Sequence, residues 1–241
     1  MSDRIRRAFV PMTASPDERM ELDPEESHHV ARVLRLKRGD ALRVFDGAGR
    51  EWEATIEDIA KDRVYVARGR EVEGRIEAPL PVVLYQANVR PEKLEWVLQK
   101  GTELGVAAFR IVSPERSEAP PPSPARLARY RRILLEACKQ SGRRVLPSLA
   151  VGEMDAPEAD VVAIVLAQAS PPLGGILQGK APREVWIAVG PEGGWEEGEV
   201  SALAGRGWRP GSLGPRVLRT ETAGAVAAAV VLHTWGDLGP V

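Results

Sequence analysis

Two glycine-bearing stretches in the last quarter of the chain hold the residues best suited to chemistry. The first, VGPEGGWEEGEV (residues 189–200), follows an apolar run and places Glu192 among glycines. The second, SLGPRVLRTETAGA (residues 212–225), carries Arg216 and Arg219. Glycine lets the backbone approach a ligand closely, and arginine can hold an anionic substrate. Together the two stretches predict one pocket for a ligand with anionic character.

A simpler explanation is open for each stretch. The first could be a tight turn from strand to helix, with Glu192 merely solvated. Each arginine of the second could form a salt bridge with Glu192 or Glu221. Residues 184–189 form an apolar strand, however, and open α/β sheets bind ligands at the carboxyl ends of their strands. The position therefore favours a ligand site.

The elements that must position these stretches alternate between strands and helices. After residue 79 the predicted strands are PVVLYQA, AFRIV, DVVAIVLAQ and EVWIAVG. The predicted helices are PEKLEWVLQKGTELG, ARLARYRRILLEACKQSG, EEGEVSALAGRG and TAGAVAAAVVLHTWG. This alternation is typical of an α/β fold with a parallel sheet covered by helices. At the start of the last helix, Thr220 or Thr222 is the expected cap.

The N-terminal part has a different pattern. A strand is expected at residues 6–10, and a helix starts at Asp23 and runs through HHVARVLRL to about Gly39. The segments ALRVF, EWEATIEDI and DRVYVARG alternate with period two and are separated by turns. We expect a small antiparallel barrel or sheet, and hence two domains, residues 1–75 and 76–241.

The composition argues against disulfide-linked, secreted and membrane-spanning proteins. The 241 residues are 44% hydrophobic and include one cysteine, Cys138, which excludes an intrachain disulfide. The start, MSDRIRRAFV, lacks an apolar core of signal-peptide length, and the longest apolar run, residues 223–232, is too short to span a bilayer. We expect a soluble cytoplasmic protein without a bound metal.

Charge is distributed unevenly along the chain. The net charge is −1, but residues 110–144 hold nine basic and three acidic side chains, and residues 28–44 hold five basic and one acidic. Basic patches on a nearly neutral chain indicate a polyanionic partner. The alternative is a solvated helix face that acids from elsewhere neutralise.

One motif is misleading. GGILQGKA, residues 174–181, matches the phosphate-binding pattern G-x-x-x-x-G-K, but Ala181 stands where a magnesium-binding hydroxyl is required. The segment also ends just before a strand, whereas the pattern requires a loop between strand and helix. We do not expect a nucleoside triphosphate site there.

The last helix is small and apolar almost all round, so it must be buried on most sides. Only one face can meet the sheet of its own domain. The other faces predict a subunit interface, which we expect to form a homodimer.

The chain resembles a known family. GPEGGWEEGE followed by LGPRVLRTETA is similar to the small-subunit ribosomal RNA methyltransferases that modify N3 of a uridine in 16S rRNA, which are knotted enzymes of the SPOUT superfamily. RRAF, HHVARVLRLKRGD, KGTELGV, ERSE and EACKQSGRRVLP match further family segments in order, so the resemblance covers nearly the whole chain. Lys139 departs from the acidic or neutral residue expected before Gln140.

The resemblance implies an N-terminal PUA-like barrel that binds RNA and a C-terminal SPOUT α/β domain with a deep trefoil knot. It implies a homodimer that acts on 16S rRNA of the small ribosomal subunit, with S-adenosyl-L-methionine as cofactor. Carried over to this sequence, the cofactor residues are Leu166, Gly190, Glu192, Gly193, Leu213, Gly214, Leu218, Arg219 and Thr222.

Methylation of N3 requires loss of its proton as the methyl group arrives, so a proton acceptor and a stabilising cation are needed. Arg219 is the first candidate for the cation and Arg7 the second. Glu221 and Glu192 are candidate acceptors by location only, and His29 is expected to be a half-buried helix residue. The expected RNA-binding residues are Arg6, Arg7, Arg32, Arg35, Lys37, Arg38, Arg131, Arg132 and Arg143.

Two other functions are consistent with parts of this pattern. One is a SPOUT methyltransferase that acts on another RNA, such as tRNA, although the order of barrel first and knot second argues against it. The other is an RNA-binding module without catalysis, which a degraded cofactor loop would indicate. Both glycine loops are intact in this sequence.

Reversal of two charges tests the RNA-binding patch. The double variant Arg131→Glu/Arg132→Glu is expected to weaken RNA binding, because phosphate contacts dominate affinity, and to leave cofactor affinity unchanged. Filter binding and calorimetry measure the two affinities. Equal loss of both would show that the patch is structural.

Overall fold

A computed structural model describes residues 5–11, 19–61 and 63–239. The chain divides into two compact units. The first comprises Met1–Glu77 with Cys138–Leu146, and the second comprises Ala78–Ala137 with Pro147–Val241. A short segment from the middle of the chain therefore belongs with the N-terminal residues.

The first unit is built on a five-stranded sheet with the order β1-β3-β4-β5-β2. Its strands are β1 (Arg7–Phe9), β2 (Arg19–Glu21), β3 (Ala41–Phe45), β4 (Glu51–Ala60) and β5 (Arg63–Glu71). Neighbouring strands are antiparallel except β1 and β3, which are parallel. Alternate residues of the long strands face the core, among them Leu42, Val44, Ile56, Val64 and Val66. The expected antiparallel sheet is confirmed, with one parallel pair at its edge.

The helix of this unit begins as expected and changes character early. Asp23 caps α1 (Pro24–His28) by accepting a hydrogen bond from the Glu26 amide at 2.8 Å. From His29 the chain forms a π-helical turn, η1 (His29–Val33), instead of the regular helix expected to about Gly39. The Leu36 amide then bonds to the Val30 carbonyl, and both side chains lie in the core. The wider turn thus places two apolar side chains in one core.

Ion pairs tie Cys138–Leu146 to the rest of the first unit. Arg143 Nε lies 2.8 Å from Glu77, and Arg144 Nε lies 3.2 Å from Glu51. Lys139 Nζ lies 2.7 Å from Glu26, and both of these side chains are almost fully buried. Buried charges are stable only when paired, so these contacts hold the segment in place.

The second unit contains a six-stranded sheet in which all neighbours are parallel, with the order β11-β9-β10-β6-β7-β8. Its strands are β6 (Val82–Ala87), β7 (Ala108–Val112), β8 (Ser148–Val151), β9 (Val161–Leu166), β10 (Glu184–Val189) and β11 (Arg209–Gly211). Its helices are α2 (Pro91–Leu104), α3 (Pro124–Ser141), α4 (Leu173–Ile176), α5 (Glu197–Gly205) and α6 (Thr220–Trp235). The α/β fold with a parallel sheet is confirmed.

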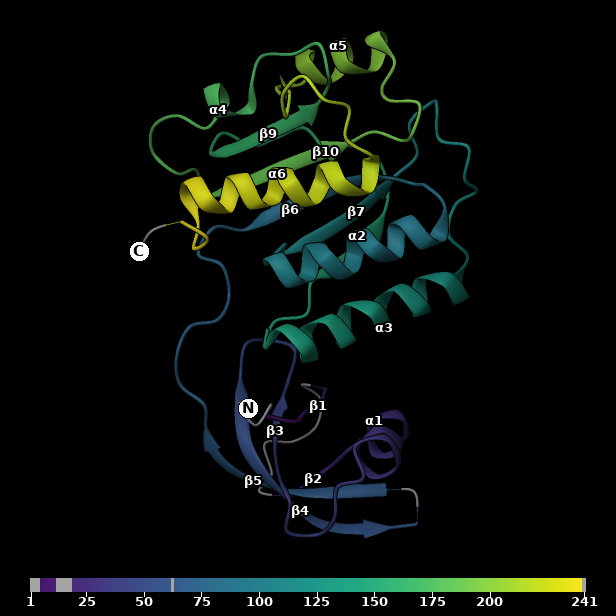
Figure 1. Cartoon of the computed structure of the whole chain (residues 1–241), viewed down its shortest axis with the longest axis vertical. Helices are drawn as coiled ribbons and strands as arrows, with labels where there is room; N and C mark the ends of the chain where they lie inside the picture. The colour runs from purple at the N-terminus through teal and green to yellow at the C-terminus, as the bar shows by residue number, and fades with distance from the viewer. Residues whose placement is uncertain (1–4, 12–18, 62, 240–241) are drawn as a thin grey trace. The chain divides into compact units, whose positions relative to one another are not determined.

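Helices cover both faces of this sheet because its strands alternate apolar residues between them. Leu84 and Ile187 pack with α2, α3 and α6 on one face, where α2 and α6 lie side by side (Figure 1). Tyr85 and Ala188 pack with Leu203 of α5 on the other. The carboxyl ends of β6, β9, β10 and β11 lie along one edge, and the chain order reverses between β6 and β10.

Within the described part of the chain, no helix combines the length and the apolar character needed to cross a membrane. The same residues contain no group of three or more histidine, cysteine or acidic side chains arranged to hold a metal ion.

Packing of α2 on β7 leads to a stability prediction. A Cβ at Gly101 would lie 2.7 Å from Cε1 of the buried Phe109 ring. Gly101→Ala is therefore expected to lower the free energy of unfolding by about 1–3 kcal/mol, despite the better helix propensity of alanine. Urea denaturation measures this loss.

Gly198 of α5 is the matched control, because its Cβ would meet nothing within 4 Å. Gly198→Ala is expected to be neutral or to stabilise by about 0.5 kcal/mol. Equal effects of the two substitutions would contradict the packing argument.

Candidate active site

The candidate site lies where three connections leave the carboxyl edge of the parallel sheet. One follows β9 after Leu166, one joins β10 to α5, and one joins β11 to α6. In the last of these Gly214 has φ +102°, a conformation that glycine adopts without strain. Two connections from neighbouring strands can therefore surround one ligand mainly with backbone.

A hydroxyl joins these connections at their base. Thr220 Oγ1 donates a hydrogen bond of 2.6 Å to the Gly190 carbonyl and accepts one of 2.9 Å from Gln86 Nε2. Thr220 and Gln86 are buried, so little water competes for these bonds. The expected capping role of Thr220 or Thr222 is wrong: the N-cap is Arg219, without a side-chain bond, and Thr220 is the first helical residue. Its hydroxyl binds the neighbouring strand end instead.

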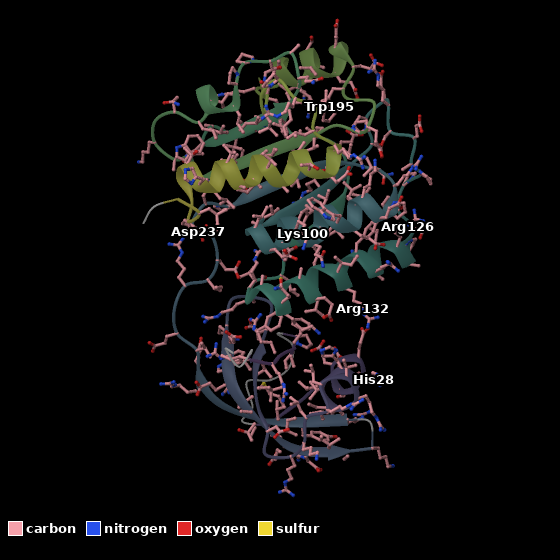
Figure 2. All side chains as sticks on the ribbon, in the orientation of Figure 1. His28, Lys100, Arg126, Arg132, Trp195 and Asp237 are labelled. Carbon is pink, nitrogen blue, oxygen red and sulfur yellow. The ribbon has the colours of Figure 1, made fainter. Side chains whose placement is uncertain are left out.

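The glycines of the β10–α5 connection serve different purposes. A Cβ at Gly190 would lie 3.1 Å from Nε1 of Trp195, the residue labelled in Figure 2 on this connection. Gly193 accepts a hydrogen bond of 2.8 Å from Arg116 Nη1, and its Cβ would lie 3.3 Å from Arg116 Cδ. Gly194 has φ +72°. The connection therefore folds tightly against Trp195 and Arg116.

Arg116 was missed as a site residue by the sequence argument. It follows β7 within ERSE, a segment noted only for its family resemblance. Its guanidinium also bonds to Glu196, the N-cap of α5, and its pKa is raised by that bond and by the charge of Glu196. Nothing in the sequence pairs residue 116 with residue 193, since they come from different strand ends.

A cluster of four charged side chains spans the two glycine connections. Lys93 Nζ, from α2, lies 2.9 Å from Glu192 and 3.9 Å from Glu221. Arg219 Nη1 lies 3.9 Å from Glu221, and its side chain is 81% exposed. The alternative prediction, that Arg219 forms a salt bridge with Glu221, is therefore confirmed in part. The contact is long and leaves the guanidinium exposed to solvent. Lys93 was not anticipated.

The two glutamates differ in environment. Burial alone would raise the pKa of Glu192, but the hydrogen bond from Lys93 and a backbone hydrogen bond outweigh it, so the pKa lies below its ordinary value. Glu221 is only 15% exposed, and its Oε2 has no hydrogen-bond partner among the described residues. Glu192 is therefore the more fully paired carboxylate and Glu221 the more available one.

Unpaired polar atoms support a ligand at this edge. Among the described residues, five side-chain polar atoms are buried without a hydrogen-bond partner. Tyr130 Oη and Trp186 Nε1 lie on α3 and within β10, and the other three are Gln86 Oε1, Trp195 Nε1 and Glu221 Oε2. Such groups are rare in folded proteins, because an unmade hydrogen bond is costly. These three lie on β6, on the β10–α5 connection and on α6, the segments that frame the candidate site. The donor and acceptor set fits a polar ligand with amino, carboxyl and hydroxyl groups.

The structure places the predicted cofactor residues on these connections. Leu166 ends β9, and Leu213 is half-buried against the core of the sheet. Leu218 and Thr222 are half-buried on either side of Arg219 and the helix start. The predicted set that lies at this edge is Leu166, Gly190, Glu192, Gly193, Leu213, Gly214, Leu218, Arg219 and Thr222.

Arg7 lies in the first unit, not at this edge. Its Nε lies 2.6 Å from Glu51, and its other nitrogens donate to the carbonyls of Cys138 and Arg143 at 2.7 and 2.9 Å. The Arg143 side chain is likewise buried against Glu77. Both guanidinium groups are thus engaged within the unit, which is a physical argument against direct RNA contact or catalysis by either.

The remaining predicted basic residues are exposed. In the first unit these are Arg6, Arg32, Arg35, Lys37 and Arg38, and on α3 they are Arg131 and Arg132. His29 is half-buried in the π-helical turn, as expected. Lys180 of the misleading glycine motif follows the four-residue α4 and precedes β10, so no phosphate-binding loop forms there.

Comparison with known proteins assigns the chain to a family. The RNA methyltransferase domain family matches residues 76–232, which is more than half of the chain.

This chain belongs to the RNA methyltransferase family. The PUA domain of RNA methyltransferases matches residues 22–67, within the five-stranded sheet unit. Ribosomal RNA small subunit methyltransferase E of Synechocystis sp. is 37% identical over 219 residues, covering 87% of this chain and 71% of the relative. The enzyme of the same name from Bacillus subtilis is 28% identical over 95% of this chain and 96% of its own.

Solved structures agree with this membership. Ribosomal RNA small subunit methyltransferase E from Neisseria gonorrhoeae, bound to S-adenosyl methionine, has a TM-score of 0.90 and 30% identity over 97% of this chain and 99% of its own. A Legionella pneumophila protein in complex with the same cofactor has a TM-score of 0.88 and 34% identity over 98% of this chain and 100% of its own. The family resemblance inferred from the two glycine loops is confirmed.

The bond that joins the loops of this RNA methyltransferase can be tested directly. Thr220→Val keeps the side-chain shape but leaves the Gly190 carbonyl without its donor, so we expect a loss of about 1–3 kcal/mol in unfolding free energy. Thermal denaturation measures it.

Thr234 near the end of the same helix is the control. Its hydroxyl donates to the Val230 carbonyl at 2.9 Å on the surface, so Thr234→Val should change stability by less than about 0.5 kcal/mol. Similar losses in both variants would show that the buried bond has no special role.

Proposed function

We propose that this protein transfers a methyl group from S-adenosylmethionine to N3 of a uridine in the 16S rRNA of the small ribosomal subunit. The single observation that carries the proposal is the edge of the parallel sheet, where two glycine connections are joined through Thr220 and flanked by buried polar atoms without partners. Relatives named ribosomal RNA small subunit methyltransferase E, one of them bound to S-adenosyl methionine, support it.

The residues proposed to hold the cofactor are those of the three connections. Gly190 and Gly193 supply backbone close to the ligand, because neither has a side chain to fill the space beside Trp195 and Arg116. Leu166, Leu213 and Leu218 supply apolar contacts. When bound, the cofactor would supply a methyl group already activated by its positive sulfonium. The chain then has to orient the uracil and accept its proton.

Glu221 is the better placed of the two proposed proton acceptors. Its Oε2 is buried and has no hydrogen-bond partner in the described structure, whereas Glu192 accepts a bond of 2.9 Å from Lys93. The lowered pKa of Glu192 also makes it a weaker base than an ordinary glutamate. We therefore assign proton acceptance at N3 to Glu221.

Arg219 is proposed to stabilise the negative charge that develops on the uracil oxygens. Its guanidinium is largely exposed and only 3.9 Å from Glu221, so it can reach both the carboxylate and a base held beside it. A fixed cation near the developing charge lowers the barrier without reorganisation. The Arg7 alternative is less favourable, because its guanidinium is fully engaged with Glu51 and two carbonyls.

RNA is proposed to contact the exposed basic residues of both units. These are Arg6, Arg32, Arg35, Lys37 and Arg38 of the first unit, with Arg131 and Arg132 of α3. None of them lies on the three connections proposed to hold the cofactor, so we expect RNA affinity and cofactor affinity to change independently.

The assembly proposed is a cytoplasmic homodimer with a trefoil knot in the methyltransferase domain. The dimer is supported by α6, whose buried stripe includes Gly224, Ala227 and Val231 while Val226 on another face remains 36% exposed. A helix this apolar leaves a surface that a second copy can cover.

Methyl transfer provides the test. Small ribosomal subunits that lack the modification are incubated with labelled S-adenosylmethionine, and digested nucleosides are identified by mass spectrometry. We expect label in 3-methyluridine. Gly190→Ala should reduce transfer by weakening cofactor binding, because its Cβ crowds Trp195, whereas Gly198→Ala should not.

Other outcomes discriminate between functions. Label in a different nucleoside, or in tRNA only, would assign the protein to another RNA substrate. Cofactor binding without any transfer would contradict the proposed reaction and favour a non-catalytic RNA-binding module.

A further inference from the structure

Lys93 occupies a position that local rules disfavour. It is the third residue of α2, after the N-cap Arg90 and Pro91. The amino end of a helix carries a partial positive charge, so a lysine there is repelled by the dipole. A residue that violates a local preference requires compensation from the tertiary structure, and such residues concentrate at functional sites.

The compensation comes from both glycine connections. Lys93 Nζ lies 2.9 Å from Glu192 Oε1, after β10, and 3.9 Å from Glu221 Oε2, after β11. The Lys93 side chain is 26% exposed, so solvent screens these contacts less than it would on an open surface. One ammonium therefore lies between two carboxylates that are 29 positions apart in the chain.

The two contacts are unequal. Glu192 takes the short hydrogen bond, which leaves Glu221 Oε2 at the longer distance and without a hydrogen-bond partner among the residues described. The other cations near the pair are Arg219, 3.9 Å from Glu221, and Arg90, whose charge acts on Glu192. The arrangement therefore places the Glu221 carboxylate near two cations and leaves its Oε2 without a hydrogen bond.

We propose that Lys93 is a positioning residue for methyl transfer: it ties the two cofactor connections together through Glu192 and Glu221, and so holds Glu221 in place to accept the N3 proton. This inference rests on the proposed function. In the step concerned, N3 forms its bond to the methyl carbon, the sulfonium bond to that carbon breaks, and the N3 proton passes to Glu221.

The test compares Lys93→Met and Lys93→Arg with Lys100→Met. Lys100, labelled on α2 in Figure 2, pairs with Glu103 of the same helix and provides the matched loss of one lysine. For each protein, calorimetry gives the affinity for S-adenosylmethionine, and methyl transfer to small subunits gives kcat and KM separately.

Loss of the tie should affect cofactor binding and turnover together. Without the ammonium neither carboxylate is held in place, so Lys93→Met should lower the affinity for S-adenosylmethionine and reduce kcat, each about tenfold, while the KM for small subunits stays unchanged. Lys93→Arg, which keeps the charge, should recover most of the activity, and Lys100→Met should match the wild type.

Glu192→Gln supplies a second test of the tie. It removes the charge of the carboxylate that accepts the short bond from Lys93. Cofactor affinity should fall, because one side of the tie is weakened. This variant keeps the inference testable if Lys93→Met fails to fold.

Three results would overturn the inference. The first is a kcat and a cofactor affinity of Lys93→Met equal to those of Lys100→Met. The second is a loss confined to RNA affinity, which would make Lys93 a phosphate ligand. The third is a cofactor affinity that Glu192→Gln leaves unchanged. If the wild type transfers no methyl group, the proposed function fails. Unchanged cofactor affinity in both Lys93→Met and Glu192→Gln would then also show that Lys93 does not link the two cofactor connections.

Discussion

The hydrogen bond from the Thr220 hydroxyl to the Gly190 carbonyl is the contact on which the site depends. It joins the first residue of α6 to the first residue after β10, and Gln86 donates to the same hydroxyl from β6. The helix can start this close to the sheet because residue 224 is a glycine: a Cβ there would lie only 3.2 Å from Leu84. A small residue and a buried hydroxyl thus bring two connections within reach of one ligand.

Charged side chains serve two purposes in this protein, one in each unit. In the PUA-containing unit, Arg7 and Arg143 are buried against Glu51 and Glu77, so their role is to hold the segment around residue 143 in place. At the edge of the parallel sheet, Lys93 and Arg219 approach Glu221 only to 3.9 Å. Removing one partner of a buried pair is costly, so the buried pairs hold their segment in place, whereas the long contacts to Glu221 leave it able to interact with a substrate.

The glycine-rich connection after β10 shows why the composition of a loop does not by itself reveal its conformation. Gly190 is required by the nearness of Trp195, Gly193 by the nearness of Arg116, and Gly194 by its positive φ. Glycine thus satisfies three different structural requirements in this one connection. The arrangement explains why a connection of this kind departs from the dinucleotide-binding pattern yet still forms a ligand site with its backbone.

The sequence by itself determined the α/β class, the order of the longer strands and helices, the two glycine loops and the family, because periodicity, turn residues and short motifs are local properties. It also placed Glu192, Arg219 and Glu221 near one site, since they follow strands whose carboxyl ends share an edge. It did not predict the short elements β2, β8 and α4, which span too few residues to show a period. Only the tertiary structure decided that His29 begins a π-helical turn and that Thr220 binds a strand end rather than capping its helix. Only it decided the partners of Arg7, Arg116 and Lys93. Each of these contacts joins residues far apart in the chain, and a sequence pattern carries no information about which distant partner a charged side chain will meet.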